Sequence, residues 1–186
     1  MKIQKNQLDK ELQRFYGATM MMARLMSRVW GIKMLQGTMR FVRGKNIKGL
    51  DNDERYIPSS HNGPDIRVRI YKPLDVSPGE KLPVLLYLHG GGYVFGCPEV
   101  FGVLMEKFIQ ARPCIVVSPD YRKALEAPFP GGFNDCYDTL LWVRDHADEL
   151  GARSDKFMIG GHSAGGGMTA ALTWKARDTG DVKVAF

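Results

Sequence analysis

The 186-residue chain is poor in the features of secreted disulfide-rich, zinc-binding and membrane-spanning proteins. Its cysteines, Cys97, Cys114 and Cys136, are only three and include no C-x-x-C pair, so neither a disulfide framework nor a metal site is expected. Basic residues at positions 24, 28 and 33 interrupt the apolar N-terminal stretch, and the first 15 residues lack the apolar run of a signal peptide. These absences argue against a membrane span and a secretory leader, and we expect a cytoplasmic protein.

Positive charge is concentrated at one end of the chain. Residues 1–50 hold 11 lysines and arginines against two acids, although the net charge of the whole chain is only +6. This segment is rich in methionine and patterned for helix. Few aromatic residues interleave its basic positions, so nucleic-acid binding is not expected. Peripheral contact with an anionic lipid surface, through a basic amphipathic helix, remains open.

The rest of the chain alternates between apolar runs and helical patterns. Alternation of this kind favours parallel strand pairing with helices on both faces of a sheet. The expected strands are Asp53–Ser59, Ile66–Lys72, Val84–Leu88, 114–121 and Phe157–Ile159; the expected helices are Glu99–Ala111, 132–149 and one beginning at Ala164.

One serine stands between glycines where a strand is predicted to turn directly into a helix. The stretch Gly161–Gly165 reads G-H-S-A-G, and strand-G-x-S-x-G-helix is the pattern of a nucleophile elbow. The flanking glycines remove Cβ atoms that would collide in so tight a turn. Ser163 is therefore expected to have a strained backbone, with its Oγ exposed above the free N–H groups of a helix N-terminus. A dinucleotide fingerprint at 165–170 is disfavoured because its glycines begin inside the helix.

A second glycine loop follows the Val84–Leu88 strand. Residues 89–92 read H-G-G-G, and glycines let several backbone N–H groups point at one spot. In acyl-transfer enzymes such a spot holds the oxygen of the tetrahedral intermediate. H-G-G-G upstream of G-x-S-x-G is more specific than either motif alone. We expect His89 to brace this loop by hydrogen bonding.

Three blocks in this order resemble the hormone-sensitive-lipase family of α/β-hydrolases, the H-G-G-G esterases. The resemblance covers about residues 50 to 186 and implies an α/β-hydrolase fold with a mixed, mostly parallel sheet. It also implies hydrolysis of short- to medium-chain carboxylic esters through an acyl-enzyme, without metal or organic cofactor. By resemblance, Ser163 is the nucleophile, and the N–H groups of Gly91, Gly92 and Ala164 form the oxyanion hole. The blocks are HGGGYVFG (89–96), SPDYRKALEAPFP (118–130) and GHSAGG (161–166).

The middle and last blocks depart from the family pattern. The family usually has Leu-Ala-Pro-Glu where this chain has Lys-Ala-Leu-Glu at 123–126, in a loop that helps to shape the site. Aspartate is common in the family where this chain has His162. The preceding cluster Asp120-Tyr121-Arg122 is expected to anchor the loop by salt bridges.

The partners that a nucleophilic serine needs are missing at the expected place. In this fold an acid and then a histidine follow the serine. After Ser163 the only acids are Asp178 and Asp181, and no histidine follows. His162 is a poor base because neighbouring side chains diverge at a sharp turn. The remaining histidines are expected in the oxyanion loop, in a turn (His61) and on a helix surface (His146).

The last residues of the sequence have the alternation of another strand. Val182, Val184 and Phe186 alternate with residues 183 and 185, and the sequence stops inside this pattern. We therefore expect a hydrolase core, residues 49–186, truncated after the helix of the nucleophile elbow. Residues 1–48 would be a cap-like helical segment, as the family resemblance suggests, with flexible methionines that adapt to varied shapes.

Two functions follow from these patterns. The first is an ester hydrolase that acts on a small-molecule ester, with the acid and histidine of the triad lacking in this chain. The second is a catalytically inactive remnant or an interaction module of the same fold. The sequence does not distinguish an esterase from an amidase or acyltransferase, and it does not indicate an oligomeric state.

Overall fold

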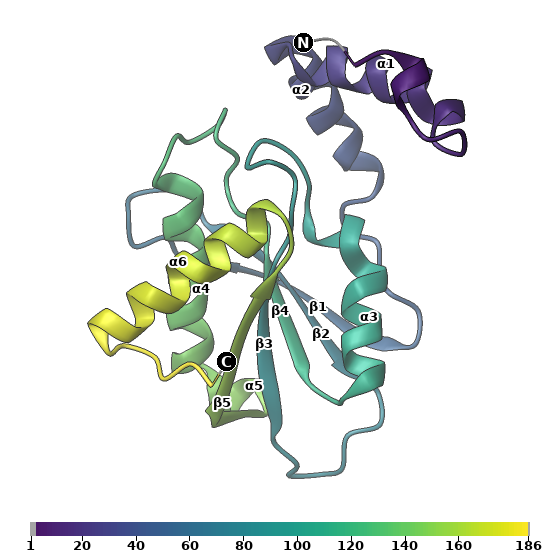
Figure 1. Ribbon diagram of the computed structural model, residues 1–186. Helices are drawn as coiled ribbons and strands as arrows, with labels where there is room; N and C mark the ends of the chain where they lie inside the picture. Colours follow the sequence, from purple (N-terminus) through teal and green to yellow (C-terminus); the bar gives the residue numbers. More distant parts are fainter. Residues whose placement is uncertain (1–2, 186) are drawn as a thin grey trace. The chain divides into compact units, whose positions relative to one another are not determined.

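The computed structural model describes residues 3–185, and the chain divides into two compact units, Met1–Thr38 and Met39–Phe186 (Figure 1). In the first unit, α1 (Tyr16–Met26) and α2 (Val29–Thr38) follow two short 3₁₀ turns, η1 (Lys5–Gln7) and η2 (Gln13–Phe15). Gly31 of α2 is buried against the backbone of Leu25, where a Cβ atom would lie 2.0 Å from the Leu25 carbonyl oxygen. The two helices pack closely because this position has no side chain.

The second unit is built on a mixed five-stranded sheet in the order β1-β2-β4-β3-β5. Strand β2 is antiparallel to β1 and β4, whereas β3 is parallel to both of its neighbours, β4 and β5. The expected mixed sheet is confirmed. Its strands are β1 (Leu50–Ile57), β2 (Ile66–Pro73), β3 (Leu82–Leu88), β4 (Ile115–Pro119) and β5 (Ala152–Gly161).

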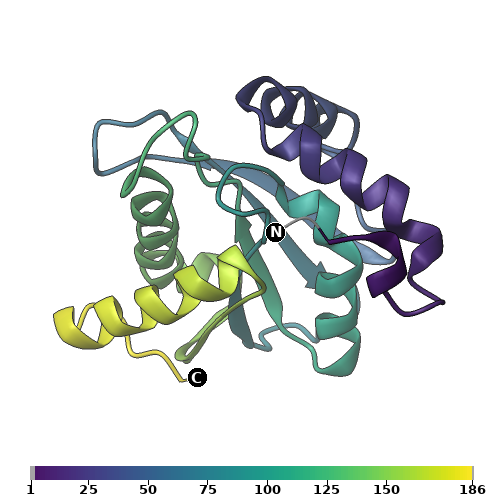
Figure 2. The same cartoon turned by 45° about the horizontal axis from the view of Figure 1, so that its top comes forward.

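Helices cover both faces of this sheet, as predicted. Figures 1 and 2 show α3 on one face and α4 and α6 on the other. One cluster of buried side chains, which includes Tyr71, Met105 and Val116, lies beneath α3, and a larger cluster fills the opposite side. The remaining elements are η3 (Met39–Phe41), η4 (Pro98–Phe101), α3 (Gly102–Ala111), α4 (Gly131–Asp145), α5 (Ala147–Leu150) and α6 (Ala164–Thr179).

Two predicted helices differ from the structure. The predicted helix 99–111 begins with the 3₁₀ turn η4, which has Pro98 in its first turn, before α3 starts at Gly102. The predicted helix 132–149 is broken at His146, whose φ of −108° and ψ of 18° leave the helical region. His146 therefore lies between α4 and α5 and not within one helix; its partly exposed ring stacks on Trp142, and its Nδ1 hydrogen-bonds the Trp142 carbonyl at 2.9 Å.

The predicted strand near residue 186 is present only as a single bridge. Val184 pairs in parallel with Phe157 of β5, and the Ala185 N–H donates to the Phe157 carbonyl at 2.7 Å. Phe186, the last residue of the predicted strand, lies outside the described residues. Among residues 3–185, no helix has the length and apolar character needed to cross a membrane.

Candidate active site

The two glycine motifs lie side by side because their strands are neighbours. Strands β3 and β5 pair in parallel, and Leu88 is opposite Gly161 at their carboxyl ends. The loop after β3 and the turn after β5 therefore start from adjacent points on one edge of the sheet. This is the edge at which open α/β sheets carry their ligand sites.

Ser163 has the strained backbone predicted for a nucleophile elbow. Its φ of 53° and ψ of −122° lie in a region that residues with a side chain rarely adopt. A Cβ on Gly161 would lie 2.7 Å from the Gly165 backbone, and one on Gly165 would lie 2.0 Å from the Leu88 carbonyl oxygen. Ser163 itself is exposed, and α6 begins at the next residue, Ala164.

The loop after β3 depends on left-handed backbone conformations. Gly91, Gly92 and Tyr93 have φ values of 131°, 60° and 64°. A Cβ on Gly91 would lie only 1.9 Å from the Phe95 carbonyl oxygen, so no other residue fits there without moving the backbone. The Val94 N–H closes the turn by donating to the Gly91 carbonyl at 3.1 Å.

His89 braces this loop, as predicted. Its Nδ1 lies 2.8 Å from the Gly90 carbonyl oxygen, and its own carbonyl accepts a hydrogen bond from the Tyr121 hydroxyl at 2.7 Å. The two rings stack with centroids 4.3 Å apart. Burial, together with the nearby charge of Lys123, lowers the pKa of His89 to about 3. The imidazole is therefore neutral at pH 7, and Nδ1 donates its proton to the Gly90 carbonyl.

The segment after β4 is anchored by ion pairs, which confirms the role expected for its Asp-Tyr-Arg cluster. The carboxylate of Asp135, on α4, accepts hydrogen bonds from the Arg122 backbone N–H at 2.8 Å and from its guanidinium at 2.6 Å. Two residues further on, the Ala124 N–H donates to the Tyr93 carbonyl at 2.8 Å. The segment therefore holds the glycine loop near both of its ends, at His89 and at Tyr93.

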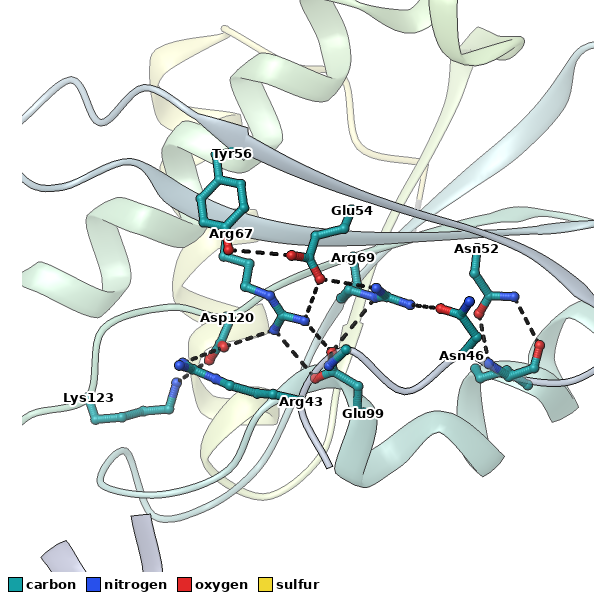
Figure 3. A network of polar contacts seen from close by, with 12 residues as sticks. Arg43, Asn46, Asn52, Glu54, Tyr56, Arg67, Arg69, Glu99, Asp120 and Lys123 are labelled. Atoms are coloured by element: carbon teal, nitrogen blue, oxygen red, sulfur yellow. Dashed lines mark hydrogen bonds and ion pairs between the residues drawn. The ribbon is translucent and has the colours of Figure 1, made fainter. Parts of the chain in front are cut away.

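The buried carboxylate of Asp120 joins three basic side chains in a network of charges (Figure 3). Its carboxylate pairs with Arg43 at 2.6 Å, with Arg67 at 3.1 Å and with Lys123 at 3.0 Å. Burial alone would raise the pKa of Asp120, but the charges of Lys123 and Arg43 outweigh it and lower the pKa. Lys123 is buried, and its ammonium is satisfied by Asp120 and by the Tyr121 carbonyl, to which it also donates.

The network continues across β1 and β2. Arg67 pairs with Glu54 at 2.8 Å and with Glu99, and Glu54 also pairs with Arg69 at 3.1 Å. Glu99 accepts a further hydrogen bond from the Gly44 N–H at 2.9 Å. Sequence reasoning missed this network because its members are far apart in the chain. The only local signal is that Arg67 and Arg69 are two positions apart in β2, so that both side chains lie on the same face of the strand.

Within residues 3–185, none of the four histidines is hydrogen-bonded to the Ser163 hydroxyl. His162 places its Nδ1 2.8 Å from the Tyr87 hydroxyl and its ring edge-on to Phe101, at 4.2 Å. His61 hydrogen-bonds Ser60, and the rings of His89 and His146 bond to backbone carbonyls. These contacts support the interpretation of His162 as a poor base.

The two acids that follow Ser163 also have other partners. Asp178 pairs with the exposed Arg177, and Asp181 accepts a hydrogen bond from the Tyr137 hydroxyl at 2.6 Å. Across residues 3–185, no group of three or more His, Cys, Asp or Glu side chains is arranged to hold a metal ion.

Comparison with known proteins agrees with this geometry. A family model described as alpha/beta hydrolase fold matches residues 85–186. The chain is similar to carboxylesterase NlhH of Mycobacterium tuberculosis, with 38% identity over 122 residues, 66% of this chain and 38% of that one. It is also similar to esterase LipI of Mycobacterium tuberculosis, with 34% identity over 134 residues, 71% of this chain and 42% of that one.

Solved esterase structures have the same fold. A bacterial heroin esterase superposes with a TM-score of 0.76 and 34% identity, over 96% of this chain and 56% of that one. An esterase of Pyrobaculum calidifontis superposes with a TM-score of 0.69 and 34% identity, over 82% of this chain and 50% of that one. The matched region spans about two-fifths of the first curated relatives and about half of these solved chains.

The chain belongs to the alpha/beta hydrolase fold family. The predicted resemblance to the hormone-sensitive-lipase family is confirmed too, because the relatives are carboxylesterases of that kind.

Proposed function

We propose that this chain carries the nucleophile and the oxyanion hole of a carboxylic ester hydrolase. In this proposal Ser163 Oγ attacks the ester carbonyl and forms an acyl-enzyme. The N–H groups of Gly91, Gly92 and Ala164 stabilise the oxyanion of the tetrahedral intermediate. The alcohol of the ester then leaves, and hydrolysis of the acyl-enzyme restores the serine.

The observation that carries the proposal is the meeting of two strained turns at one sheet edge. Ser163 has positive φ at the end of β5, and the non-glycine residue Tyr93 has positive φ in the glycine loop after the paired strand β3. Each strain is of the kind that persists only where the surrounding structure enforces it, and such residues gather at functional sites. The Ala164 N–H is among the first four of α6, which have no partner within the helix.

The proposal needs a base, and within residues 3–185 no histidine is hydrogen-bonded to the Ser163 hydroxyl. We therefore expect the 186-residue chain alone to turn over esters weakly. Serine hydrolases that lack a triad member keep a residual acceleration of about 10³–10⁴ over water, from the oxyanion hole and substrate binding. The alternative, an inactive remnant or interaction module of the same fold, predicts no acceleration at all.

A simple assay separates the two functions. The full chain is incubated with the p-nitrophenyl esters of acetate, butyrate and laurate, and release of p-nitrophenol is compared with that from heat-unfolded chain. We expect slow release, faster from acetate and butyrate than from laurate, because we propose short- to medium-chain acyl groups as substrates. Release equal to that of the unfolded chain from all three esters would favour the inactive alternative. A p-nitroanilide and an added acyl acceptor test the amidase and acyltransferase alternatives.

For residues 1–48 we propose the cap-like role that the family resemblance suggests. The first compact unit exposes large apolar side chains, among them Phe15, Met21 and Trp30, and an apolar surface of this kind normally has a partner. Replacement of Trp30 and Met34 by serine should change the acyl-length profile of the assay above. If these substitutions instead weaken binding to anionic vesicles and leave the profile unchanged, the segment contacts lipid.

A further inference from the structure

A groove of about 390 Å³ lies beside the first turns of α6. Its walls come from three places: Tyr93, directly after the oxyanion glycines; the loop after β4 together with the first turn of α4, from Tyr121 to Phe133; and the α6 residues Gly167, Met168 and Ala171. Its volume is within the range of about 300–1,000 Å³ that is typical of small-molecule sites.

Two of these wall residues connect the groove to the nucleophile. Tyr93 follows Gly92 in the chain, and the Gly167 N–H donates to the Ser163 carbonyl at 3.1 Å, one helical turn after the serine. The Tyr93 ring lies over α6 because position 167 is glycine: a Cβ there would lie 2.7 Å from the Tyr93 hydroxyl oxygen. Tyr93 keeps this place although its φ of 64° is unfavourable.

The lining suits an uncharged apolar group. Phe129 and Phe133, with ring centroids 6.3 Å apart, form one side of the groove, and Met168 and Ala171 belong to the other. The one charged group in the lining, the Arg122 guanidinium, pairs with Asp135, and the Tyr121 hydroxyl donates to the His89 carbonyl; the Tyr93 hydroxyl is an uncharged polar group. A charged group in the groove would lose its hydration without gaining a free counter-charge.

We propose that this groove binds an uncharged aromatic or branched apolar part of the ester substrate, and that Tyr93 and Gly167 limit its size. The inference rests on the proposed function, because it makes the groove part of the same site. It predicts a preference for esters that carry one bulky apolar group over esters in which both parts are small.

Binding of a ligand that cannot be hydrolysed tests the groove without chemistry at Ser163. The probe is 2-acetonaphthone, an uncharged aryl ketone, titrated into the ¹⁵N-labelled full chain and followed by NMR. We expect saturable shifts confined to amides around Gly167, Ala171 and Phe133. 2-Naphthoate, which has a similar size but a negative charge, should bind at least tenfold more weakly. Absence of saturable binding, shifts elsewhere, or equal binding of the two ligands would overturn the proposal.

Two neighbouring alanines give a matched pair of variants. Ala170 and Ala171 are both exposed on α6, but only Ala171 lines the groove. Ala171→Phe should fill the groove and weaken 2-acetonaphthone binding at least tenfold, whereas Ala170→Phe should leave it within twofold. Equal effects of the two substitutions would place the ligand outside the groove. If the ketone binds as expected but Ser163 is never acylated, the proposed ester chemistry fails while the binding site stands.

Discussion

Gly165 packs directly against Leu88, the last residue of the strand that leads into the glycine loop 89–92. A Cβ on Gly165 would lie 2.0 Å from the Leu88 carbonyl oxygen and 2.7 Å from that of His89. The first turn of α6 therefore touches the backbone from which the glycine loop starts. This contact between two main chains holds the turn at Ser163 close to that loop.

Substitution of this glycine should be far more harmful than substitution of its neighbour. Gly165→Ala forces two main chains apart, and we expect it to lower the free energy of unfolding by about 3 kcal/mol. Gly166→Ala is the control, because its Cβ would be no closer than 3.5 Å to any neighbour, and it should raise stability by about 0.5 kcal/mol through helix propensity. Urea unfolding of both variants measures the difference. Similar stabilities would contradict the close contact.

Tyr121 should stabilise the glycine loop through one hydrogen bond, to the His89 carbonyl. Tyr121→Phe keeps the ring stacked on His89 but leaves the buried His89 carbonyl without its donor, which costs about 1–3 kcal/mol. Amide hydrogen exchange across residues 89–96 should become faster in this variant. Tyr137→Phe is the control: it also removes a hydroxyl, one that bonds Asp181 and Thr179. Amide exchange across residues 89–96 should be unchanged in Tyr137→Phe. An equal increase in exchange rate in both variants would argue against bracing of the loop through Tyr121.

Asp120 should be the most sensitive member of the charge network. Asp120→Asn leaves the charges of Arg67 and Lys123 without their shared carboxylate, and loss of one partner from a buried pair costs about 3–5 kcal/mol. Asp178→Asn removes the same charge from an exposed pair with Arg177 and should change stability by less than about 0.5 kcal/mol. Thermal unfolding of the two variants makes the comparison. A small effect at Asp120 would mean that the network contributes little.

Stability should fall below neutral pH because of His89. Its pKa is lowered from 6.5 to about 3 in the folded chain, so below pH 6.5 the unfolded chain takes up a proton that the folded chain does not. The free energy of unfolding should therefore decrease by about 1.4 kcal/mol per pH unit from this residue, from pH 6.5 down to about 3. The lowered pKa values of Asp120 and Glu99 add a further loss below about pH 4.

A substitution isolates the contribution of His89 to the pH dependence of the free energy of unfolding. In His89→Asn the amide can still donate to the Gly90 carbonyl but does not titrate, so the slope between pH 6.5 and 4.5 should disappear. His146→Asn is the control and should keep it. Urea unfolding at several pH values gives both slopes. An unchanged slope in His89→Asn would assign the pH dependence to other groups.

The sequence was most informative where the chemistry depends on local backbone geometry. Two apolar runs, Val84–Leu88 and Phe157–Ile159, predicted two strands. The glycines that follow these runs predicted a strained turn at Ser163 and a loop braced by His89. These features follow from residues that are close in the chain. The pairing of β3 with β5, which brings the two motifs together, followed only from the general rule for alternating strands and helices.

Long-range features were not predictable in the same way. The ion pairs of Asp120 with Arg43 and Arg67 join residues that are more than 50 positions apart, and nothing in the sequence specifies those partners. The break at His146 was missed because the helical pattern continues through it. The groove beside α6 was also missed, since it depends on the path of the loop between β4 and α4.

Labelling of the serine tests the central claim most directly. The full chain is incubated with a fluorophosphonate, and the modified residue is identified by mass spectrometry of its peptides, with Ser163→Ala and, as a control, Ser154→Ala. We predict slow formation of a single adduct on Ser163, absent from Ser163→Ala and unchanged in Ser154→Ala. Adducts on other side chains at the same rate, or labelling that persists in Ser163→Ala, would contradict the assignment of Ser163 as the nucleophile.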